Sequence, residues 1–567
     1  MTTLREQLAF RLREALLRAG LSEDVVEISP ATTSKFGDYQ SNTAMVLAKR
    51  LGANPRTIAE RIVASLNVAD LSAPPEIAGA GFLNFRFSQE FLTRRISCIF
   101  DDDRMGVPFA CHRKRIIIDF SCPNVAKPMH VGHIRSTILG DALARIARFL
   151  GHEVITDNHI GDWGTQFGKV IYGWKHFLDQ DRLAREPVEE LVRLYRHTHR
   201  LEEENPAIAA QARKELVLLQ QGDPENLRIW KQSVELSWKE FEKIYRTLEI
   251  HFDQCLGESF YNEALRPLVE RLLETKVAQP SEGAVCIFFP ETPELTPCIV
   301  RKTDGGFLYA TTDLATIEYR VKTWNPDAIW YVTGAPQALH FRQIFAAARR
   351  LGIQAELVHI AFGSILGEDR KMMKTRSGEN VALAELLNEA IERASKIIAE
   401  KNPTLPSEER QNLASAIGIG AVKYAELSQH RMTDYVFSWD KMLSFQGNTA
   451  PYLQNAYVRI RSLFRKSNAI PQETCAILLE SPEERALALR LLQFGETVSA
   501  VLEEFRPNLL ANYLFELANL FHGFYEKCPV LRAENAIRHS RLALCHLTAR
   551  VLSQGLSLLG IRAPEKM

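Results

Sequence analysis

Two histidines separated by a valine and a glycine stand at the start of a predicted helix. The segment His130-Val-Gly-His133 follows a buried-strand pattern and precedes apolar residues at helical spacing. Backbone N–H groups at a helix N-terminus attract phosphate, and imidazoles three positions apart can donate to the same phosphate. Gly132 leaves room for a flat base or a ribose. The alternative is that both histidines only cap the helix.

The segments around these histidines predict a strand–helix–strand unit. Its elements cover residues 114–120, 134–150 and 153–156. Gly151 is a suitable residue to end the helix. A second unit of the same kind covers residues 328–332, 340–351 and 356–361. Because such crossovers join parallel strands, the two units predict one doubly wound α/β domain with a long insertion.

Other regions of the chain have different patterns. The first hundred residues mix helical periodicity with an alternating strand at Phe82–Phe87, which predicts a small α+β domain. The insertion begins with charged helices, and the chain after about residue 380 is helical almost throughout. We predict an N-terminal domain at residues 1–110 and a doubly wound domain in two parts, 111–180 and 290–380. An insertion at 181–289 separates these two parts. A helical stem at 381–445 and an all-α domain at 446–567 follow.

Composition excludes several classes of protein. Of the 567 residues, 46% are hydrophobic and 24% charged, which is ordinary for globular chains rather than disordered ones. No apolar run is long enough to span a membrane. Lysine plus arginine and aspartate plus glutamate both number 69. This balance excludes a strongly basic protein that coats nucleic acid, although it allows a local basic groove. Nine cysteines without a Cys-x-x-Cys pair predict a reducing cytoplasm.

Two other nucleotide-binding motifs are absent from the sequence. A P-loop would need a glycine where Trp163 stands and a hydroxyl residue where Val170 follows Lys169. Gly418 and Gly420 lack the third glycine of a dinucleotide fingerprint. The phosphate site is therefore expected at the two histidines.

Two longer blocks resemble a known family. The first is Ser121-Cys-Pro-Asn-Val-Ala-Lys-Pro-Met-His-Val-Gly-His-Ile-Arg-Ser-Thr137, which resembles the HIGH signature of class I aminoacyl-tRNA synthetases in its arginyl form. The second, Asn158–Gly168, is similar to a further arginyl-type block. The family's second loop, KMSKS, is matched in part by Lys371-Met-Met-Lys-Thr375, where Met373 and Thr375 replace serines. The similarity extends over nearly the whole chain.

The resemblance implies an ATP site. The implied catalytic residues are His130, His133, Lys371 and Lys374, and the implied ATP-binding residues are Lys127, His130, Gly132, His133, Lys371, Met372 and Lys374. Activation joins an amino-acid carboxylate to the α-phosphate, so the protein must align the reactants and stabilise phosphate charge. Mg²⁺ would accompany ATP, and no protein-bound metal is expected. Taken alone, the two lysines could belong to a solvated loop.

Arginine as substrate requires a pocket with carboxylates, because the guanidinium is planar and always charged. Tyr309 and Asp313 are four positions apart, so on a helix they would share a face. The resemblance implies that both contact the guanidinium, together with Glu258. The full set implied to bind arginine is Asp119, Asn124, Glu258, Tyr309, Asp313 and Gln337.

The resemblance also implies tRNA-binding surfaces at both ends of the chain. In arginyl synthetases the N-terminal domain contacts the tRNA elbow, and Phe82 and Asn84 match positions that stack on and hydrogen-bond a D-loop adenosine. The alternative is that Phe82 belongs to the core, as alternation with Phe85 would allow. The C-terminal domain is similar to an anticodon-binding domain, with Tyr452, Asn455 and Arg459 as the implied contacts.

The resulting hypothesis is a monomeric cytoplasmic arginine–tRNA ligase. Its expected partners are tRNA(Arg), L-arginine and ATP, and no membrane partner is expected. The resemblance implies that tRNA is needed even for the first step, the formation of arginyl-adenylate. Another ATP-dependent ligase or nucleotidyltransferase would lack the long helical C-terminus. A catalytically inactive tRNA-binding paralogue would have lost histidines or lysines that this chain retains.

Overall fold

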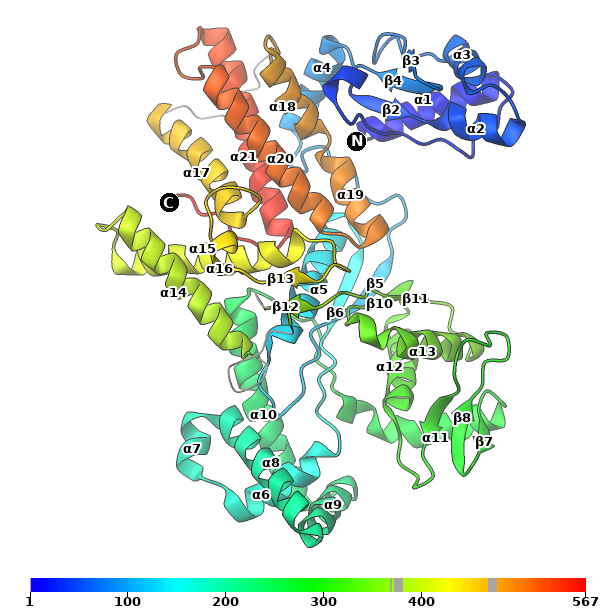
Figure 1. Ribbon diagram of the computed structural model, residues 1–567, viewed down its shortest axis with the longest axis vertical. Coiled ribbons are helices and arrows are strands. Elements are labelled where there is room, and N and C mark those ends of the chain that lie inside the picture. The colour runs from blue at the N-terminus through cyan, green and yellow to red at the C-terminus, as the bar shows by residue number, and fades with distance from the viewer. Residues whose placement is uncertain (1, 368–369, 372–380, 468–476) are drawn as a thin grey trace. The chain divides into compact units, whose positions relative to one another are not determined.

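The chain forms two compact units. The computed structural model describes residues 2–367, 370–371, 381–467 and 477–567 (Figure 1). The first unit runs up to Ala110 and resumes with Ser444–Leu558 and Arg562–Met567. The second unit comprises Cys111–Leu443 and Leu559–Ile561.

A parallel four-stranded sheet lies in the second unit, with the strand order β11-β10-β5-β6. Its strands are β5 (Arg115–Asp119), β6 (Glu153–Asp157), β10 (Ala328–Tyr331) and β11 (Glu356–His359). The order reverses between β5 and β10, and at such a point the loops that leave the two strands diverge and open a crevice. This sheet confirms the predicted doubly wound domain.

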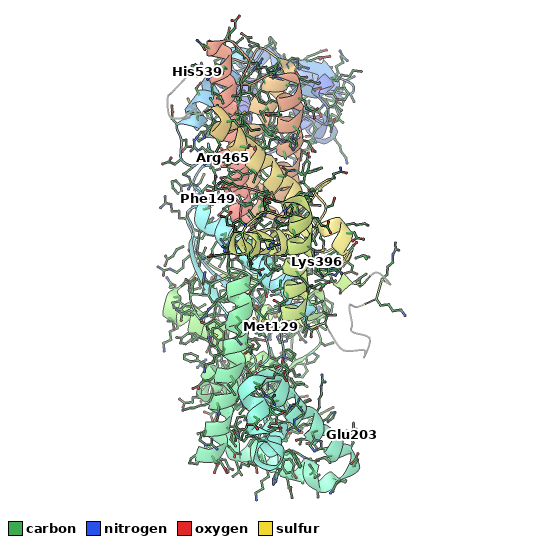
Figure 2. All side chains as sticks on the ribbon, turned by 90° about the vertical axis from the view of Figure 1, so that its left-hand side faces the viewer. Met129, Phe149, Glu203, Lys396, Arg465 and His539 are labelled. Carbon is green, nitrogen blue, oxygen red and sulfur yellow. The ribbon has the colours of Figure 1, made fainter. Side chains whose placement is uncertain are left out.

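Helices of the second unit include α5 (Val131–Phe149), which links β5 to β6 and carries most of its residues buried. Met129 and Phe149, labelled in Figure 2, mark its two ends. Between β10 and β11 lies α13 (Ala338–Arg350), preceded by the short helix η3 (Ala335–Gln337). The remaining helices after the insertion are α12 (Tyr309–Trp324), α14 (Leu383–Lys401), α15 (Ser407–Leu427) and α16 (Trp439–Met442). A two-stranded parallel pair joins β12 (Ile365–Leu366) to β13 (Tyr435–Val436).

The insertion is helical first and then forms a sheet. Its helices are α6 (Gln166–Phe177), α7 (Gln180–Arg185), α8 (Pro187–Glu204), α9 (Pro206–Gln220), α10 (Pro224–Thr247), η2 (Glu258–Tyr261) and α11 (Asn262–Glu274). A three-stranded antiparallel sheet follows, made of β7 (Gln279–Ser281), β8 (Ala284–Ile287) and β9 (Cys298–Arg301). Because β9 pairs with β8, this sheet continues past residue 289, where the sequence pattern had suggested that the insertion ends.

The N-terminal part of the first unit is the expected α+β fold. Its antiparallel sheet has the order β1-β2-β4-β3. The elements are α1 (Leu4–Arg18), β1 (Ser29–Pro30), η1 (Ser34–Phe36), β2 (Tyr39–Ser41), α2 (Thr43–Leu51), α3 (Pro55–Ser65), β3 (Glu76–Ala78), β4 (Phe82–Phe85) and α4 (Gln89–Phe100). A Thr3–Glu6 capping box begins α1, as this residue pair favours.

Five helices make up the C-terminal part of the first unit. They are α17 (Ala450–Ser467), α18 (Pro482–Leu492), α19 (Phe494–Glu504), α20 (Asn508–Lys527) and α21 (Asn535–Leu558). Arg485 of α18 forms two hydrogen bonds with the buried carboxylate of Asp38, at 2.9 and 2.7 Å, which ties the two parts of this unit together. Within the described ranges, no helix is both long and apolar enough to cross a membrane.

Packing of α5 on the sheet depends on a glycine. A Cβ on Gly140 would lie 2.2 Å from Cγ of Phe120, a fully buried ring whose Cβ is also within 2.5 Å. These atoms lie next to the backbone, so the ring cannot swing away. The close approach of helix and strand therefore requires glycine at this position.

We expect Gly140→Ala to lower the stability of the second unit by about 1–3 kcal/mol, the usual result of overpacking a core. Alanine's better helix propensity, about 1 kcal/mol, does not offset the clash. Scanning calorimetry of the full chain measures the resulting fall in melting temperature. Gly523→Ala in α20 is the matched control, because no atom lies within 4 Å of its Cβ, and it should be neutral or stabilising. Equal melting temperatures of Gly140→Ala and wild type would contradict this packing argument.

Candidate active site

The loop that leaves β5 has a strained backbone. Ser121, Cys122 and Ala126 have positive φ angles of 77°, 49° and 60°. Such conformations cost of order 1–3 kcal/mol each for residues other than glycine, and they persist only where surrounding contacts determine them. The loop that carries the first family block is therefore held by its neighbours.

Hydrogen bonds from three distant segments hold this loop. The N–H of Ser121 donates to Oγ of Ser136 at 2.9 Å, and that hydroxyl donates to the carbonyl of Val332 at 2.6 Å. The hydroxyls of Ser121 and Tyr245 lie 2.8 Å apart, and Nδ2 of Asn158 donates to Tyr245 at 2.9 Å. Residues from α5, α10 and the segment after β6 thus fix the loop at the point where the strand order reverses, and Val332, directly after β10, holds Ser136 in place.

His130 and His133 cap the N-terminus of α5 reciprocally. Nδ1 of His130 accepts from the N–H of Gly132 at 3.0 Å, and Nδ1 of His133 accepts from the N–H of His130 at 3.1 Å. A backbone amide can only donate, so each Nδ1 acts as the acceptor. The proton of each neutral ring is then on Nε2, which leaves one donor per histidine. The capping and phosphate-binding interpretations are therefore compatible.

Both rings are held in the neutral form. Burial, and to a smaller extent His130, lowers the pKa of His133 to about 3. Burial, followed by Lys127, lowers the pKa of His130 below its usual value. The ring centroids are 4.0 Å apart. Exposed Lys127 is the nearby positive charge, so this end of the site offers neutral N–H donors beside one cation.

The lysine loop begins and ends at described residues. Exposed Lys371 accepts at its carbonyl from the N–H of Gly367 at 2.8 Å. Past the loop, Val381 accepts from the N–H of Val131 at 3.0 Å. The segment that follows the loop therefore pairs directly with the start of α5. Lys374 and Met372 lie outside the described residues.

A buried ion pair supports the strand before this loop. Nε of Arg135 in α5 lies 3.1 Å from Oε2 of Glu426 in α15, and both side chains are buried. Tyr435 of β13 donates to the same carboxylate. Burial raises the pKa of Glu426 to about 7, while Arg135 opposes the shift. Because β13 pairs with β12, the cluster links the histidine helix to the strand that leads into the lysine loop. Sequence analysis missed this cluster, since its members are far apart in the chain.

Three carboxylates form an acidic cluster, and two of them were predicted. Asp313 lies in the first turns of α12, and Glu258 begins η2. Burial, followed by Asp313 and Asp162, raises the pKa of Glu258 to about 8. Asp162 was not predicted. Its carboxylate accepts from the N–H and Oγ of Ser259 at 2.8 and 2.6 Å, and burial raises its pKa.

Crowded acids of this kind favour a cation as ligand. A carboxyl whose pKa is raised by burial and by like charges regains its ionised form when a cation enters. Among the described residues, Glu258 makes no ion pair with a cationic side chain of the chain itself. The pocket is therefore suited to a ligand that carries its own positive charge.

The other predicted arginine contacts have different surroundings. Tyr309 is 70% exposed at the start of α12, one helical turn before Asp313, as expected. Asn124 and Gln337 are exposed at the ends of the loops that follow β5 and β10. Oδ1 of Asn124 occupies the space that a Cβ on Gly161 would need, at 2.2 Å. These residues lie on the crevice side of the sheet.

Asp119 differs from the other predicted contacts because its carboxylate is paired with a buried arginine. NH2 of buried Arg320 lies 2.5 Å from Asp119 and 2.8 Å from Asp157, and Sγ of Cys122 donates to Asp119 at 2.9 Å. Asp119 is only 4% exposed. The geometry gives it a structural ion pair, and its predicted contact with arginine stays a prediction.

The two predicted elbow contacts differ in exposure. Phe82 is 37% exposed, whereas its strand neighbours Leu83 and Phe85 are fully buried. Phe82 is therefore outside the core, which removes the alternative that alternation had left open. Asn84 is buried, and its Oδ1 accepts from Nε2 of Gln40 at 3.0 Å.

The predicted anticodon contacts lie on one side of α17. Tyr452 donates to Oδ1 of Asn519 in α20 at 2.6 Å, and the guanidinium of Arg459 lies 5.9 Å from the ring of Tyr525. Asn455 is half-buried between them along the helix. All three therefore share the face that turns towards α20.

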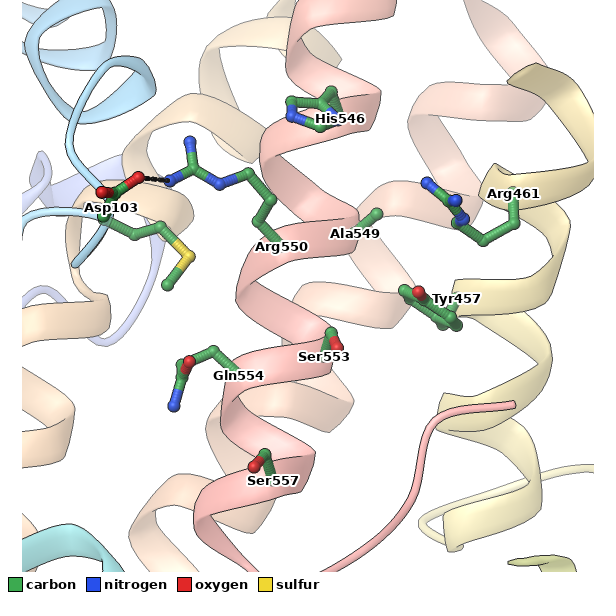
Figure 3. Close-up of a pocket in the computed structure, with 10 residues that line it drawn as sticks. Asp103, Tyr457, Arg461, His546, Ala549, Arg550, Ser553, Gln554 and Ser557 are labelled. Atoms are coloured by element: carbon green, nitrogen blue, oxygen red, sulfur yellow. Dashed lines mark ion pairs between the residues drawn. The ribbon is translucent and has the colours of Figure 1, made fainter. Parts of the chain in front are cut away.

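A pocket of about 430 Å³ lies between α17 and α21 (Figure 3). Its two arginines are already used within the chain. Nε of Arg461 pairs with Glu565 at 2.7 Å, and Arg550 donates to the carbonyls of Phe100 and Asp102 at 2.6 and 2.8 Å. The pocket thus contains no guanidinium that is free for a ligand.

We expect the ring of His133 to stay neutral, with its proton on Nε2, from about pH 5 to pH 8, because its pKa lies near 3. Nitrogen-15 NMR of the full chain with labelled histidine measures both protonation and tautomer. Exposed His251 serves as the reference ring, because it makes neither of the two capping hydrogen bonds. A proton on Nδ1 of His133, or titration near pH 6.5, would contradict the capping geometry.

Comparisons with known proteins agree with this arrangement along the whole chain. The family model for the catalytic domain of class I (R) tRNA synthetases matches residues 95–439, the DALR anticodon binding domain matches 453–567, and the arginyl tRNA synthetase N terminal domain matches 3–87. The arginine–tRNA ligase of Cellvibrio japonicus is 45% identical, with all of both chains covered. That of Thermobifida fusca is 46% identical, with 94% of both chains covered.

Solved structures give the same result. The chain is similar to the arginyl-tRNA synthetase of Plasmodium falciparum, with a TM-score of 0.87 and 30% identity, and all of both chains is covered. It is also similar to that of Thermus thermophilus, with a TM-score of 0.83 and 27% identity over all of both chains. Sequence blocks, fold and relatives agree, and the chain belongs to the arginyl-tRNA synthetase family of class I aminoacyl-tRNA synthetases.

Proposed function

We propose that the chain is an arginine–tRNA ligase that activates L-arginine with ATP and then esterifies tRNA(Arg). The observation that carries this proposal is the pairing of two sites in one unit. Neutral N–H donors stand at the N-terminus of α5, and a crowded acidic pocket contains Asp313 and Glu258. One site suits phosphate and the other suits a guanidinium, and these are the two groups that arginine and ATP bring.

The first step needs alignment and charge stabilisation rather than a covalent bond to the protein. The arginine carboxylate attacks the α-phosphate in line, the bond to the β-phosphate breaks, and pyrophosphate leaves. Nε2–H of His130 and His133 would donate to the phosphates from the end of α5. The positive charges of Lys127, Lys371 and Lys374 would stabilise the negative charge that develops on the leaving pyrophosphate. Gly132 would let the nucleotide approach, and Met372 would lie beside it.

The substrate's side chain is proposed to enter the acidic pocket. Asp313 and Glu258 would contact the guanidinium, and Tyr309 would cover it. Asn124 and Gln337 would hold the amino and carboxylate groups, which places the carboxylate near the phosphates. The guanidinium never loses its proton, so only fixed negative charge can compensate for its loss of water.

Mg²⁺ would reach the site with ATP. Within the described residues there is no group of three or more His, Cys, Asp or Glu side chains that could hold a metal. Mg²⁺ commonly keeps several waters and binds substrate phosphates. The ion would neutralise phosphate charge, and the protein steps proposed above use only side chains of the chain.

Both tRNA contacts are proposed within the first unit. Residues 1–110 would bind the elbow through Phe82 and Asn84, and residues 446–567 would bind the anticodon arm through Tyr452, Asn455 and Arg459. We further propose that tRNA is required for adenylation and that the enzyme acts as a cytoplasmic monomer. The insertion and the helical stem at 181–289 and 381–445 would connect these parts.

Arginine-dependent exchange of pyrophosphate into ATP, run with and without tRNA(Arg), tests the activity. We expect exchange with arginine and tRNA together, and little with either alone. Exchange with another amino acid, or no aminoacylation of tRNA(Arg), would contradict the proposal. Exchange without tRNA would contradict only the tRNA requirement.

We expect Asp313→Asn to weaken arginine binding about 10²-fold or more, because it leaves a desolvated guanidinium without its anion, by analogy with broken buried ion pairs worth ~3–5 kcal/mol. ATP binding should stay near normal. Citrulline is the neutral isostere, and it should lose much less, so discrimination between the two should shrink. Steady-state aminoacylation with each amino acid gives the ratio, and an unchanged ratio would place the specificity carboxylate elsewhere, with Glu258 the next to test.

We expect Phe82→Ala to raise the KM for tRNA by the equivalent of one lost base stack, ~1–3 kcal/mol. The ring is exposed, so the melting temperature should hardly change. Phe85→Ala is the matched control, because Phe85 is fully buried and its loss should lower stability. Unchanged tRNA kinetics in the Phe82 variant would contradict the elbow contact.

A further inference from the structure

A histidine contacts the carboxylate that is proposed to bind the guanidinium of arginine. Nε2 of His340, in the first turn of α13, lies 2.5 Å from Oδ2 of Asp313 in α12. The side chains are 31% and 20% exposed, so the pair is partly accessible to solvent beside the acidic cluster. Among the described residues, no lysine or arginine forms an ion pair with Asp313, and His340 is its partner.

The groups around this pair are mostly acidic. Glu258 is close enough for Asp313 to raise its pKa, which lies at about 8. Asp162 faces Glu258 and is hydrogen-bonded to Ser259. His359 of β11 faces His340 from the other side, and burial is the main cause that lowers its pKa, so it adds little positive charge. A proton on His340 therefore meets carboxylates rather than cations.

We propose that His340 is a proton-dependent stand-in for the substrate guanidinium. In the empty pocket its imidazolium neutralises Asp313. When the guanidinium of arginine reaches this carboxylate, the imidazolium releases its proton to solvent and remains as a neutral Nε2–H donor that orients Asp313. His340 is thus a positioning residue, and this role rests on the proposed contact between Asp313 and arginine.

The direction of proton transfer follows from the two cations. A guanidinium cannot be deprotonated in a protein, whereas an imidazolium can lose its proton near neutral pH. Two cations at one half-buried carboxylate repel each other, so the one that can become neutral does so. The hydrogen bond survives, because neutral imidazole still donates through Nε2. One proton leaves for each guanidinium that binds.

Glu258 is a second source of protons, and the experiment must separate the two. Its carboxyl is protonated below about pH 8 in the empty pocket and should ionise beside a guanidinium. It contributes equally in wild type and in a His340 variant. The difference between the two proteins therefore isolates His340.

Calorimetric titration of the full chain with L-arginine, in buffers of different ionisation enthalpy, counts the protons released. At about pH 6 we expect wild type to release up to one proton more than His340→Gln, whose amide keeps a neutral donor. The ratio of the wild-type Kd to the variant's Kd should rise by up to about tenfold per pH unit as the pH falls. His340→Ala should bind arginine more weakly at every pH, and the glutamine variant should restore binding at high pH.

Two controls keep the outcomes distinct. His251→Gln changes an exposed histidine outside the pocket and should leave the proton count unchanged. Nitrogen-15 NMR of the His340 ring in wild type needs no variant, and it should show imidazolium becoming neutral when arginine is added near pH 6.

Equal proton release by wild type and His340→Gln, or an imidazole ring that does not change on arginine binding, would overturn the role of His340. If Asp313→Asn leaves arginine affinity unchanged, the proposed function of Asp313 fails instead. If Asp313→Asn weakens binding strongly while the proton counts stay equal, only the inference about His340 is wrong.

Discussion

The second unit depends on how the negative charge of its buried carboxylates is compensated. Two sets of carboxylates lie near the carboxyl edge of its sheet, and the chain treats them differently. Asp119 and Asp157 share the buried guanidinium of Arg320, so this set is neutralised permanently and stabilises the ends of β5 and β6. Asp313 and Glu258 have no such fixed arginine or lysine partner among the described residues. The first set stabilises the sheet, and the second is the one proposed to bind the substrate's cation.

The phosphate end of the crevice has the opposite chemistry. At the start of α5 the available groups are backbone N–H, two neutral imidazoles and a lysine, and none of them is negative. The reversal of strand order between β5 and β10 brings the two ends to one edge of the sheet. In the proposed function, a substrate with a cationic side chain and an anionic head group would fit this charge gradient in one direction, with its head group towards the phosphates.

The sequence predicted the features that depend on neighbouring residues. Apolar spacing predicted α5 and the four parallel strands, and the position of His130 and His133 at the start of the predicted helix allowed the capping that the structure has. The spacing of Tyr309 and Asp313 correctly placed both on one helix. In the C-terminal region that the sequence predicts to be helical almost throughout, a break at Gln493 separates α18 from α19, because amphipathic periodicity does not register a local bend.

Features that depend on distant residues were not predictable in this way. Asp162, Glu426 and His340 acquire their roles from partners on other elements, and nothing in their local sequence distinguishes them from surface residues. Asp119 shows the same dependence on a distant partner, while its predicted contact with arginine stays a prediction. Its place beside the signature suggested a substrate contact, whereas Arg320, two hundred residues later, engages it in the fold. Signatures locate a site, but the charge balance of each side chain is set by packing.

Histidine shows most clearly how packing assigns chemistry. His133 is surrounded by backbone and by another imidazole, so burial dominates and the ring stays neutral. His340 has the same side chain, but its Nε2 lies against the carboxylate of Asp313, close to the further acids Glu258 and Asp162. A neutral ring suits a helix end that is proposed to donate to phosphate at any physiological pH. A ring in contact with a carboxylate suits the different role proposed for His340, because only there does an acidic partner face the imidazole.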